Sequence, residues 1–342
     1  MAPGRPSIVR RSAPLAKGWH GSGLARSLED REAQWPRIAV VGTGAVGGYF
    51  GGMLARAGAP VVMIGRGSFV DAVNEHGLDL DTVAFREYVS VHASTQLEAA
   101  RDASVVIVSV KTVDTISTAQ ALAPLLSKTA TVVSLQNGVD NAEKIHAATG
   151  ISVLPTAVYI AASVPEPGHI KHIARGDLVV DSTDERAIDI AALFERAGVP
   201  CRRSGNIKGE LWTKLIWNCA LNAISALGQS PYGQIAGSAI AWSLVESAVR
   251  EVLAVAAAEN IVMPDVQTLD QAMQGTLNIA SSMKDAYSST AQDIARGRIT
   301  EIDSLNGLIA RRGAALGVNT PVNQSLYALV KLLEQRSRTM TT

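Results

Sequence analysis

A short apolar run followed by three regularly spaced glycines constrains the fold of this 342-residue chain more than any other feature. Residues 38–41 predict a buried strand, and a helix is expected over 46–57. Between them stand Gly42, Gly44 and Gly47, in the pattern Gly-x-Gly-x-x-Gly. The first glycine permits a tight turn, the second lets the backbone approach a pyrophosphate, and the third lets helix and strand pack closely. The helix N-terminus then offers N–H groups and a positive dipole end to phosphates.

This loop predicts a dinucleotide site, against the alternative of a structural turn that binds nothing. The loop residues are Gly42, Thr43, Gly44, Ala45, Val46 and Gly47. The second strand, expected over 60–65, is followed by Arg66 and not by the acidic residue that holds the ribose 2′-hydroxyl of NAD. An arginine pairs bidentately with a 2′-phosphate. Arg66 therefore favours NADP(H), and the alternative is a solvated surface arginine.

Composition bounds the class of protein. Apolar residues make up 47% and aromatic residues 4%, which suits a parallel sheet covered by helices. Basic and acidic residues number 31 each, so no overall field favours nucleic acid or an anionic membrane. No apolar run approaches the length of a membrane span. The two cysteines, Cys201 and Cys219, fit no metal or disulfide spacing, so we expect no metal and a reduced, cytoplasmic setting.

The chain is long enough for two domains. Apolar runs at 105–110 and 131–135 predict further buried strands, and Lys111 and Asn137 follow them at the sheet edge where ligands bind. Additional strands are expected at 153–160, 169–173, 178–181 and 199–203, and helices at 115–126 and 184–197. Two short strands are expected at 77–80 and 87–92, in the segment that connects the second strand to the strand at 105–110. From Asn206 onward the pattern is helical only, with breaks at 228–231, 264, 297 and 321.

These patterns divide the chain into three parts. We expect a doubly wound α/β domain over 36–205 and an all-α domain over 206–336. Residues 1–35 are basic, with no acidic residue before Glu29, and they lack a hydrophobic period. We expect them to be a disordered or dispensable extension, against the alternative of an organellar transit peptide.

One expected helix carries an unusual polar face. Lys214, Asn218 and Asn222 recur every four residues within an otherwise apolar run. Asparagine is a poor helix former, so two in register with a lysine indicate a functional face, and the alternative is a solvated one. A second polar set covers 288–293 and 300–307, where capping of helix starts is the competing interpretation.

Several motifs, in order along residues 37–333, resemble those of the ketopantoate reductase (2-dehydropantoate 2-reductase) family. They are the 42–47 loop, Val110-Lys111, Gln136-Asn137-Gly138, Glu210-Leu211-Trp212-x-Lys214-x-x-x-Asn218-x-x-x-Asn222, and Ser289-x-x-Gln292-Asp293 with Gly297-Arg298-x-Thr300-Glu301. The resemblance implies a Rossmann-type domain followed by an all-α domain. It also implies NADPH-dependent reduction of 2-dehydropantoate to (R)-pantoate, on the route to pantothenate and coenzyme A.

The resemblance implies substrate-side roles for five residues. Lys214 would be the general acid that protonates the carbonyl oxygen as hydride reaches the carbon. Asn218, Asn222 and Ser289 would bind the hydroxyl and carboxylate of the substrate. Tyr232 stands where the family has a substrate-side asparagine, eighteen residues after the lysine. A tyrosine there changes the shape of the pocket, which leaves the identity of the oxo acid open.

On the cofactor side, the resemblance assigns contacts to Lys111, Asn137, Ala161 and Glu301. Glu301 would also lie close to the substrate, so it joins Lys214 as an expected catalytic residue. The expected partner is a small 2-oxo acid, with no nucleic acid and no membrane. The sequence does not determine the oligomeric state, and a homodimer is the state considered.

Two other functions compete with this interpretation. One is a family paralogue that reduces another small 2-oxo acid, since changes to a pocket alter substrates without altering a fold. The other is an NADPH-binding redox sensor without turnover. A sensor would need the dinucleotide loop but not the ordered set of Lys214, Asn218, Asn222 and Glu301, which argues against it.

Overall fold

The chain is described here from a computed structural model that covers residues 34–339. It divides into two compact units. The first runs to Gln136 and resumes over Asn141–Arg203, and the second contains Asn137–Asp140 and everything from Ser204. The expectation for tail residues 1–33 lies outside the described residues.

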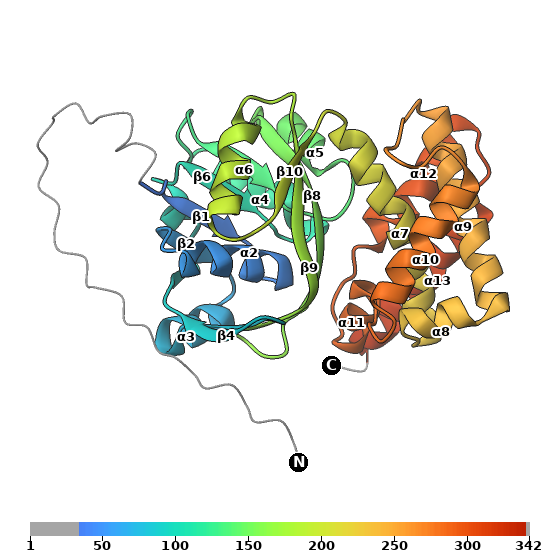
Figure 1. The fold of residues 1–342 in the computed structure, drawn as a ribbon, viewed down its shortest axis with the longest axis horizontal. Coiled ribbons are helices and arrows are strands. Elements are labelled where there is room, and N and C mark those ends of the chain that lie inside the picture. Colours follow the sequence, from blue (N-terminus) through green and yellow to red (C-terminus); the bar gives the residue numbers. More distant parts are fainter. Residues whose placement is uncertain (1–33, 340–342) are drawn as a thin grey trace, which may run out of the picture. The chain divides into compact units, whose positions relative to one another are not determined.

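The first unit is built on one ten-stranded sheet (Figure 1). Its strands are β1 (Ile38–Val41), β2 (Val61–Ile64), β3 (Leu78–Asp81), β4 (Arg86–Val89), β5 (His92–Ser94), β6 (Val105–Val108), β7 (Thr131–Ser134), β8 (Val153–Ser163), β9 (His169–Asp181) and β10 (Cys201–Ser204). They lie in the order β4-β3-β9-β8-β7-β6-β1-β2-β5, and β10 pairs with β9. From β8 to β5 all neighbours are parallel, with β1 at the centre. The doubly wound arrangement is therefore confirmed.

Helices cover both faces of this sheet. They are α2 (Ala45–Arg56), α3 (Gly67–His76), α4 (Thr115–Leu122), α5 (Asn141–Thr149) and α6 (Arg186–Arg196), with the turns η1 (Leu97–Ala100) and η2 (Thr112–Asp114). Because side chains alternate along a strand, β1 serves two cores. Ile38 and Val40 pack with α2, α3 and α6, whereas Ala39 and Val41 pack with α4 and α5. Each face of the sheet is thus buried, which explains the continuous apolar strands.

Three features of this unit differ from the sequence predictions. The segments 169–173 and 178–181 belong to one strand, β9, whose pairing with β8 is irregular next to Arg175 (φ 62°). The short strands β3 and β4 extend the main sheet, because β3 pairs with β9. Helices α3 and α5 were not predicted; α5 buries only Asn141 and Ile145, so its sequence carries almost no apolar period.

Trp35, the last residue of the segment expected to be an N-terminal extension, contacts the core of the first unit. Its ring is partly buried against the core of the first unit. The guanidinium of Arg196, at the end of α6, lies 3.8 Å from the ring centroid. This cation–π contact and the apolar area of the indole tie the start of the described chain to the folded unit. The folded part therefore includes Trp35.

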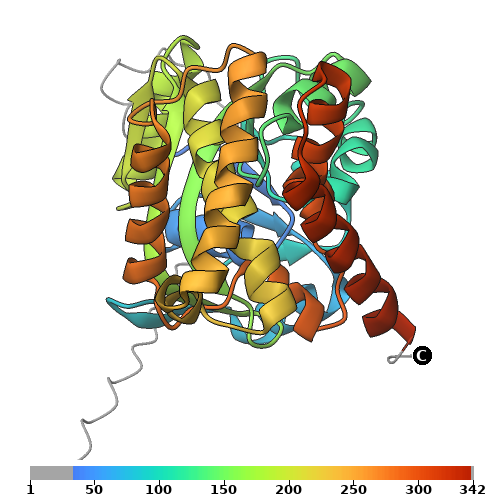
Figure 2. The same ribbon diagram turned by 90° about the vertical axis from the view of Figure 1, so that its right-hand side faces the viewer.

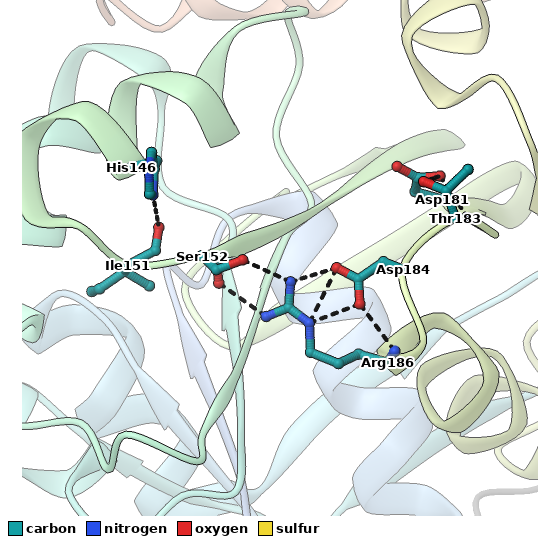
Figure 3. A network of polar contacts seen from close by, with 7 residues as sticks. All are labelled: His146, Ile151, Ser152, Asp181, Thr183, Asp184 and Arg186. Carbon is teal, nitrogen blue, oxygen red and sulfur yellow. Dashed lines mark hydrogen bonds and ion pairs between the residues drawn. The ribbon is translucent and has the colours of Figure 1, made fainter.

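A polar network fixes the start of α6 (Figure 3). The guanidinium of Arg186 lies between Asp184 and Ser152, as the close-up shows. Its Nε and Nη2 donate to the Asp184 carboxylate at 2.9 and 2.5 Å. Its Nη1 and Nη2 donate to the backbone and side-chain oxygens of Ser152 at 3.1 and 3.0 Å. The loop before β8 is thereby joined to the first turn of α6.

The second unit is all-α (Figure 2). Its helices are α7 (Ile207–Gly228), α8 (Tyr232–Gly237), α9 (Ala239–Ala258), α10 (Leu269–Ser282), α11 (Ser289–Ala295), α12 (Asn306–Leu316) and α13 (Pro321–Thr339), with the turn η3 (Ile302–Ser304). Asn206 caps α7 by accepting a hydrogen bond from the backbone N–H of Gly209, and 15 of the 22 residues of α7 are buried. Helix α7 packs against α9, α11 and α13, so its side chains reach the centre of the unit. Along residues 34–339, no helix combines the length and apolarity of a membrane span.

Candidate active site

The glycine loop adopts the geometry that its sequence predicts. Gly42 has φ 101°, and a Cβ there would lie 2.6 Å from the backbone nitrogen of Val110. A Cβ on Gly47 would lie 2.0 Å from the carbonyl oxygen of Gly42, which is why α2 can approach β1 so closely. These two glycines are required by the packing of the loop itself.

Gly44 is different, and it provides a test of whether a dinucleotide fits. A Cβ on Gly44 would meet no atom within 4 Å, so packing does not require a glycine there. Gly44 is the N-cap of α2, no side chain caps this helix, and its first turn holds no acidic residue. Open space and uncapped N–H groups at a helix N-terminus suit a phosphate. The residues present therefore fit the pyrophosphate of a dinucleotide.

The loop residues between the glycines continue this geometry. The side chain of Thr43 lies over Gly65, where a Cβ would come within 2.0 Å of its Oγ1. Ala45 and Val46 form the first turn of α2. Arg66 is exposed, directly after β2 and Gly65, and serves as the N-cap of α3 without a side-chain capping bond. Its position after the second strand is the one expected for a residue that reads the ribose.

The two other cofactor-side candidates of the first unit lie just after a strand and within a strand. Lys111 is half-buried and precedes η2, just after β6. Ala161 lies on β8 opposite Ala174, where the pairing with β9 is irregular. The neighbouring Gln136 is buried and structural, because its amide donates to the carbonyl oxygen of Val110 and to Thr115 Oγ1. Of the two amide side chains in the motif Gln136-Asn137-Gly138, the asparagine is therefore the candidate for a role at the site.

Three expected site residues meet in the second unit. The Nζ of Lys214, on α7, donates to Asn137 Oδ1 at 2.8 Å. The Nδ2 of Asn137 donates to Glu301 Oε2 at 2.8 Å. The asparagine amide thus joins a cation to a carboxylate in one hydrogen-bonded chain, and all three side chains are half-buried. Such a chain orients the ammonium.

A second polar chain begins one turn further along α7. The Nδ2 of Asn222 donates to Asn218 Oδ1 at 3.4 Å, and Asn222 Oδ1 accepts from the hydroxyl of Tyr232 at 2.9 Å. Burial raises the pKa of Tyr232 well above its usual value, so the phenol stays protonated and acts as the donor. Tyr232 therefore fixes which way the Asn222 amide faces. Asn218 is half-buried, whereas Asn222 and Tyr232 are buried.

The structure distinguishes the two serines at the start of α11. Ser289 is exposed in the first turn of the helix. Ser288 is buried and caps the helix, accepting from the N–H of Ala291, while its hydroxyl donates to the carbonyl oxygen of Asn222 at 3.0 Å. The capping interpretation is confirmed for Ser288, and this contact ties α11 to α7 at Asn222. Nothing in the sequence pattern separates this role from that of its neighbour.

Comparisons with known proteins identify the family of the chain. Residues 38–185 match the family described as ketopantoate reductase PanE/ApbA, and residues 206–334 match its C-terminal family. The 2-dehydropantoate 2-reductase of Pyrobaculum aerophilum is 34% identical over 300 residues, which cover 87% of this chain and 98% of that protein.

Solved structures show the same fold. A PanE/ApbA family ketopantoate reductase from Ralstonia eutropha JMP134 is 44% identical, with a TM-score of 0.83 over 88% of this chain and 99% of that one. A ternary structure of D-mandelate dehydrogenase with NADH and anilino(oxo)acetate is 25% identical, with a TM-score of 0.82 over 88% of this chain and 99% of that one.

Proposed function

The chain belongs to the ketopantoate reductase family, and we propose that it catalyses the NADPH-dependent reduction of 2-dehydropantoate to (R)-pantoate in pantothenate biosynthesis. It is thereby an oxidoreductase that acts on a CH–OH group with a nicotinamide cofactor. The observation that carries the proposal is the hydrogen-bonded chain from Lys214 through Asn137 to Glu301. This chain supplies an oriented proton donor, which the reduction of a ketone requires.

The residues of α7 account for the proton side of the reaction. The bound nicotinamide supplies the hydride to the carbonyl carbon. As the carbonyl oxygen gains negative charge, the ammonium of Lys214 stabilises it and donates the proton that completes the alcohol. Asn137 holds the lysine by its Oδ1 throughout, so the ammonium needs no reorientation. Glu301 keeps the asparagine amide from turning over, because it accepts from Nδ2.

Arg66 supports NADPH over NADH. Its exposed guanidinium follows β2, and no acidic residue precedes Asp71 after this strand. A guanidinium binds a 2′-phosphate by two parallel hydrogen bonds, and it offers no acceptor to a ribose hydroxyl. The carboxylate that an NAD site uses for that hydroxyl has no counterpart here.

Tyr232 favours a second candidate, the reduction of another small 2-oxo acid. Its phenol occupies the position of a family asparagine and bonds directly to Asn222. An aromatic ring beside the expected substrate amides changes the space for the substrate's side chain. D-mandelate dehydrogenase, which has a similar fold, binds anilino(oxo)acetate, an oxo acid with an aromatic group. A non-catalytic redox sensor is disfavoured, because it would have no use for the Lys214–Asn137–Glu301 chain.

We also propose a cytoplasmic setting and a homodimer. Both cysteines are free and buried. Burial raises the pKa of the Cys201 thiol to about 12, so at neutral pH this thiol is neither a thiolate nor poised for disulfide exchange.

The homodimer is tested by light scattering, which measures the mass of the particle in solution. A mass of two chains supports the dimer, and a mass of one chain contradicts it.

The function is tested by following NADPH oxidation by the purified protein with 2-dehydropantoate and with a panel that includes 2-oxoisovalerate and phenylglyoxylate. We expect the highest kcat/KM with 2-dehydropantoate. A higher kcat/KM with another oxo acid would favour the second candidate function over the reduction of 2-dehydropantoate. Binding of NADPH without oxidation by any oxo acid would contradict both.

A further inference from the structure

Glu301 stands on a segment that α13 holds on both sides. Before it, Thr300 is 2% exposed, and its backbone N–H and hydroxyl donate to Glu334 Oε1 at 2.8 and 2.5 Å. After it, Asp303 accepts from the hydroxyl of Tyr327 at 2.7 Å and from Nζ of Lys331 at 2.9 Å. Three side chains of one helix therefore hold the residues that flank the catalytic glutamate.

Glu334 is the best-placed of the three. Its side chain is 7% exposed, and its second oxygen, Oε2, lies 2.8 Å from Nζ of Lys331. Lys331 also pairs with Asp303, so one ammonium links Glu334 to a carboxylate of the segment that α13 holds. A buried carboxylate persists only when it is paired and hydrogen-bonded, and Glu334 is both. The hydroxyl of Thr300 also accepts from the N–H of Ile302 at 3.2 Å, which closes the turn around Glu301.

We propose that Glu334 is a positioning residue for the proton donor, acting through Thr300, Glu301 and Asn137 on Lys214. The inference rests on the proposed function for its kinetic consequence. Hydrogen bonds join Thr300 to Glu334, Asn137 to Glu301 and Lys214 to Asn137, and the peptide bond between Thr300 and Glu301 completes the path within the second unit. Without the grip on Thr300, the Glu301 backbone gains freedom, and the asparagine amide loses a fixed acceptor. The ammonium then samples orientations away from the carbonyl oxygen.

The chain offers a matched control at the other end of the same helix. Glu251 accepts from the backbone N–H groups of Val322 and Asn323, both at 2.8 Å, and so caps α13. None of these hydrogen bonds involves the residues that flank Glu301. Glu251 also accepts from Nδ2 of Asn323, and Glu334 also accepts from Nζ of Lys331. Replacing either glutamate by leucine therefore leaves three donors without their acceptor, so both variants suffer comparable structural damage. Only the Glu334 variant breaks the path to Lys214.

The experiment compares Glu334→Leu, Glu334→Gln and Glu251→Leu in the full chain. Turnover and KM are measured with NADPH and the best oxo acid. Acetylation of Lys214 by acetic anhydride at pH 8 is quantified by mass spectrometry without substrate. We expect Glu334→Leu to lower kcat at least about tenfold relative to Glu251→Leu, with KM within about threefold, because misplacing a reacting group acts on the transition state. Lys214 acetylation should rise at least about threefold, since an amine released from Asn137 Oδ1 is more accessible to the reagent. Glu334→Gln, which keeps an acceptor for Thr300, should recover most of both values.

The proposal is overturned if Glu334→Leu and Glu251→Leu agree within twofold in both kcat and Lys214 acetylation. Should Glu334→Leu fail to fold, Thr300→Val, which removes only the hydroxyl, is judged by the same two readouts. The acetylation readout needs no turnover. A parent protein that reduces no oxo acid therefore contradicts the proposed function, while acetylation still decides the positioning role of Glu334.

Discussion

At the scale of single residues, the proposed function depends on the direction in which individual hydrogen-bonding groups face. Tyr232 shows this most clearly, because its hydroxyl decides the orientation of the Asn222 amide. The protonated phenol can only give its proton to Oδ1, so Nδ2 of Asn222 faces Asn218. A family asparagine in place of the tyrosine would not impose this orientation, since an amide both donates and accepts.

Tyr232→Phe removes the hydroxyl and keeps the ring. We expect KM for the oxo acid to rise about five- to tenfold, about 1–1.4 kcal/mol, because the Asn222 amide loses the donor that orients it. The effect on kcat should stay within about threefold. Steady-state kinetics measures both, with Tyr287→Phe as the control, since Tyr287 is 47% exposed. An unchanged KM would show that Asn222 is oriented by something else.

Arg66→Ala tests the choice of cofactor. Loss of a charge-assisted contact costs about 1.5–3 kcal/mol, so the Kd for NADPH should rise about 10- to 100-fold. The Kd for NADH should change less than about threefold, because NADH has no 2′-phosphate. Fluorescence titration with both cofactors measures the two constants. An equal loss for both would mean that Arg66 has some other role.

At the scale of elements, the sequence predicted those whose pattern is strong and local. The apolar run of β1 and the glycines after it define their own geometry, and Gly42 and Gly47 are sterically required where they stand. The polar face of α7 was visible as a four-residue period. Helix α5 was missed because it buries little, and β9 was divided in two because the irregularity at Arg175 resembles a turn. A strand that continues through such an irregularity is stabilised by pairing with neighbouring strands. The local sequence pattern holds no information about those neighbours.

The ion pair at the start of α6 gives a pH-dependent stability. The hydrogen bond from Arg186 lowers the pKa of Asp184, with a smaller opposing effect of burial. A carboxylate whose folded-state pKa is lowered stabilises the fold above its unfolded value, near 4, and this stabilisation is lost as pH falls through the folded value. We expect Asp184→Asn to lower the free energy of unfolding by about 1 kcal/mol at pH 7 and by progressively less below about pH 4. Urea unfolding at several pH values measures this, with the exposed Asp189→Asn as control. A difference that does not depend on pH would contradict the ion-pair account.

At the scale of the whole molecule, the sequence predicted the order of its parts better than their contacts. The motifs appear in order along the chain, so an α/β part followed by an α part could be inferred from them. The hydrogen bond between Asn137 and Glu301 joins residues 164 positions apart, and that between Lys214 and Asn137 joins residues 77 apart. The family resemblance grouped these residues, but no spacing predicted that the asparagine lies between the lysine and the glutamate. The hydrogen bonds between Thr300 and Glu334 are not predicted by the sequence, because Glu334 belongs to none of the motifs and Thr300 enters its motif only as the neighbour of Glu301.

The N-terminal boundary is a prediction at this scale. A chain starting at Gln34 should keep the melting temperature and activity of the full chain, because it retains Trp35 and its contact with Arg196. Trp35→Ala within that shorter chain should lower the melting temperature by several degrees, since it removes a partly buried aromatic side chain. Differential scanning calorimetry compares the three proteins. A lower melting temperature for the chain starting at Gln34 would mean that the preceding residues contribute to folding.

The central claim is that Lys214 delivers the proton, and the turnover number of Lys214→Ala tests it most directly. We expect kcat to fall at least about 100-fold, as for loss of a general acid, while the melting temperature and the Kd for NADPH stay near those of the parent. Lys208→Ala, an exposed lysine at the start of the same helix, should leave all three unchanged. Added primary amines should restore part of the turnover of Lys214→Ala, because a small ammonium fits the vacated space. A turnover within about threefold of the parent, less than about 1 kcal/mol on the barrier, would contradict the account.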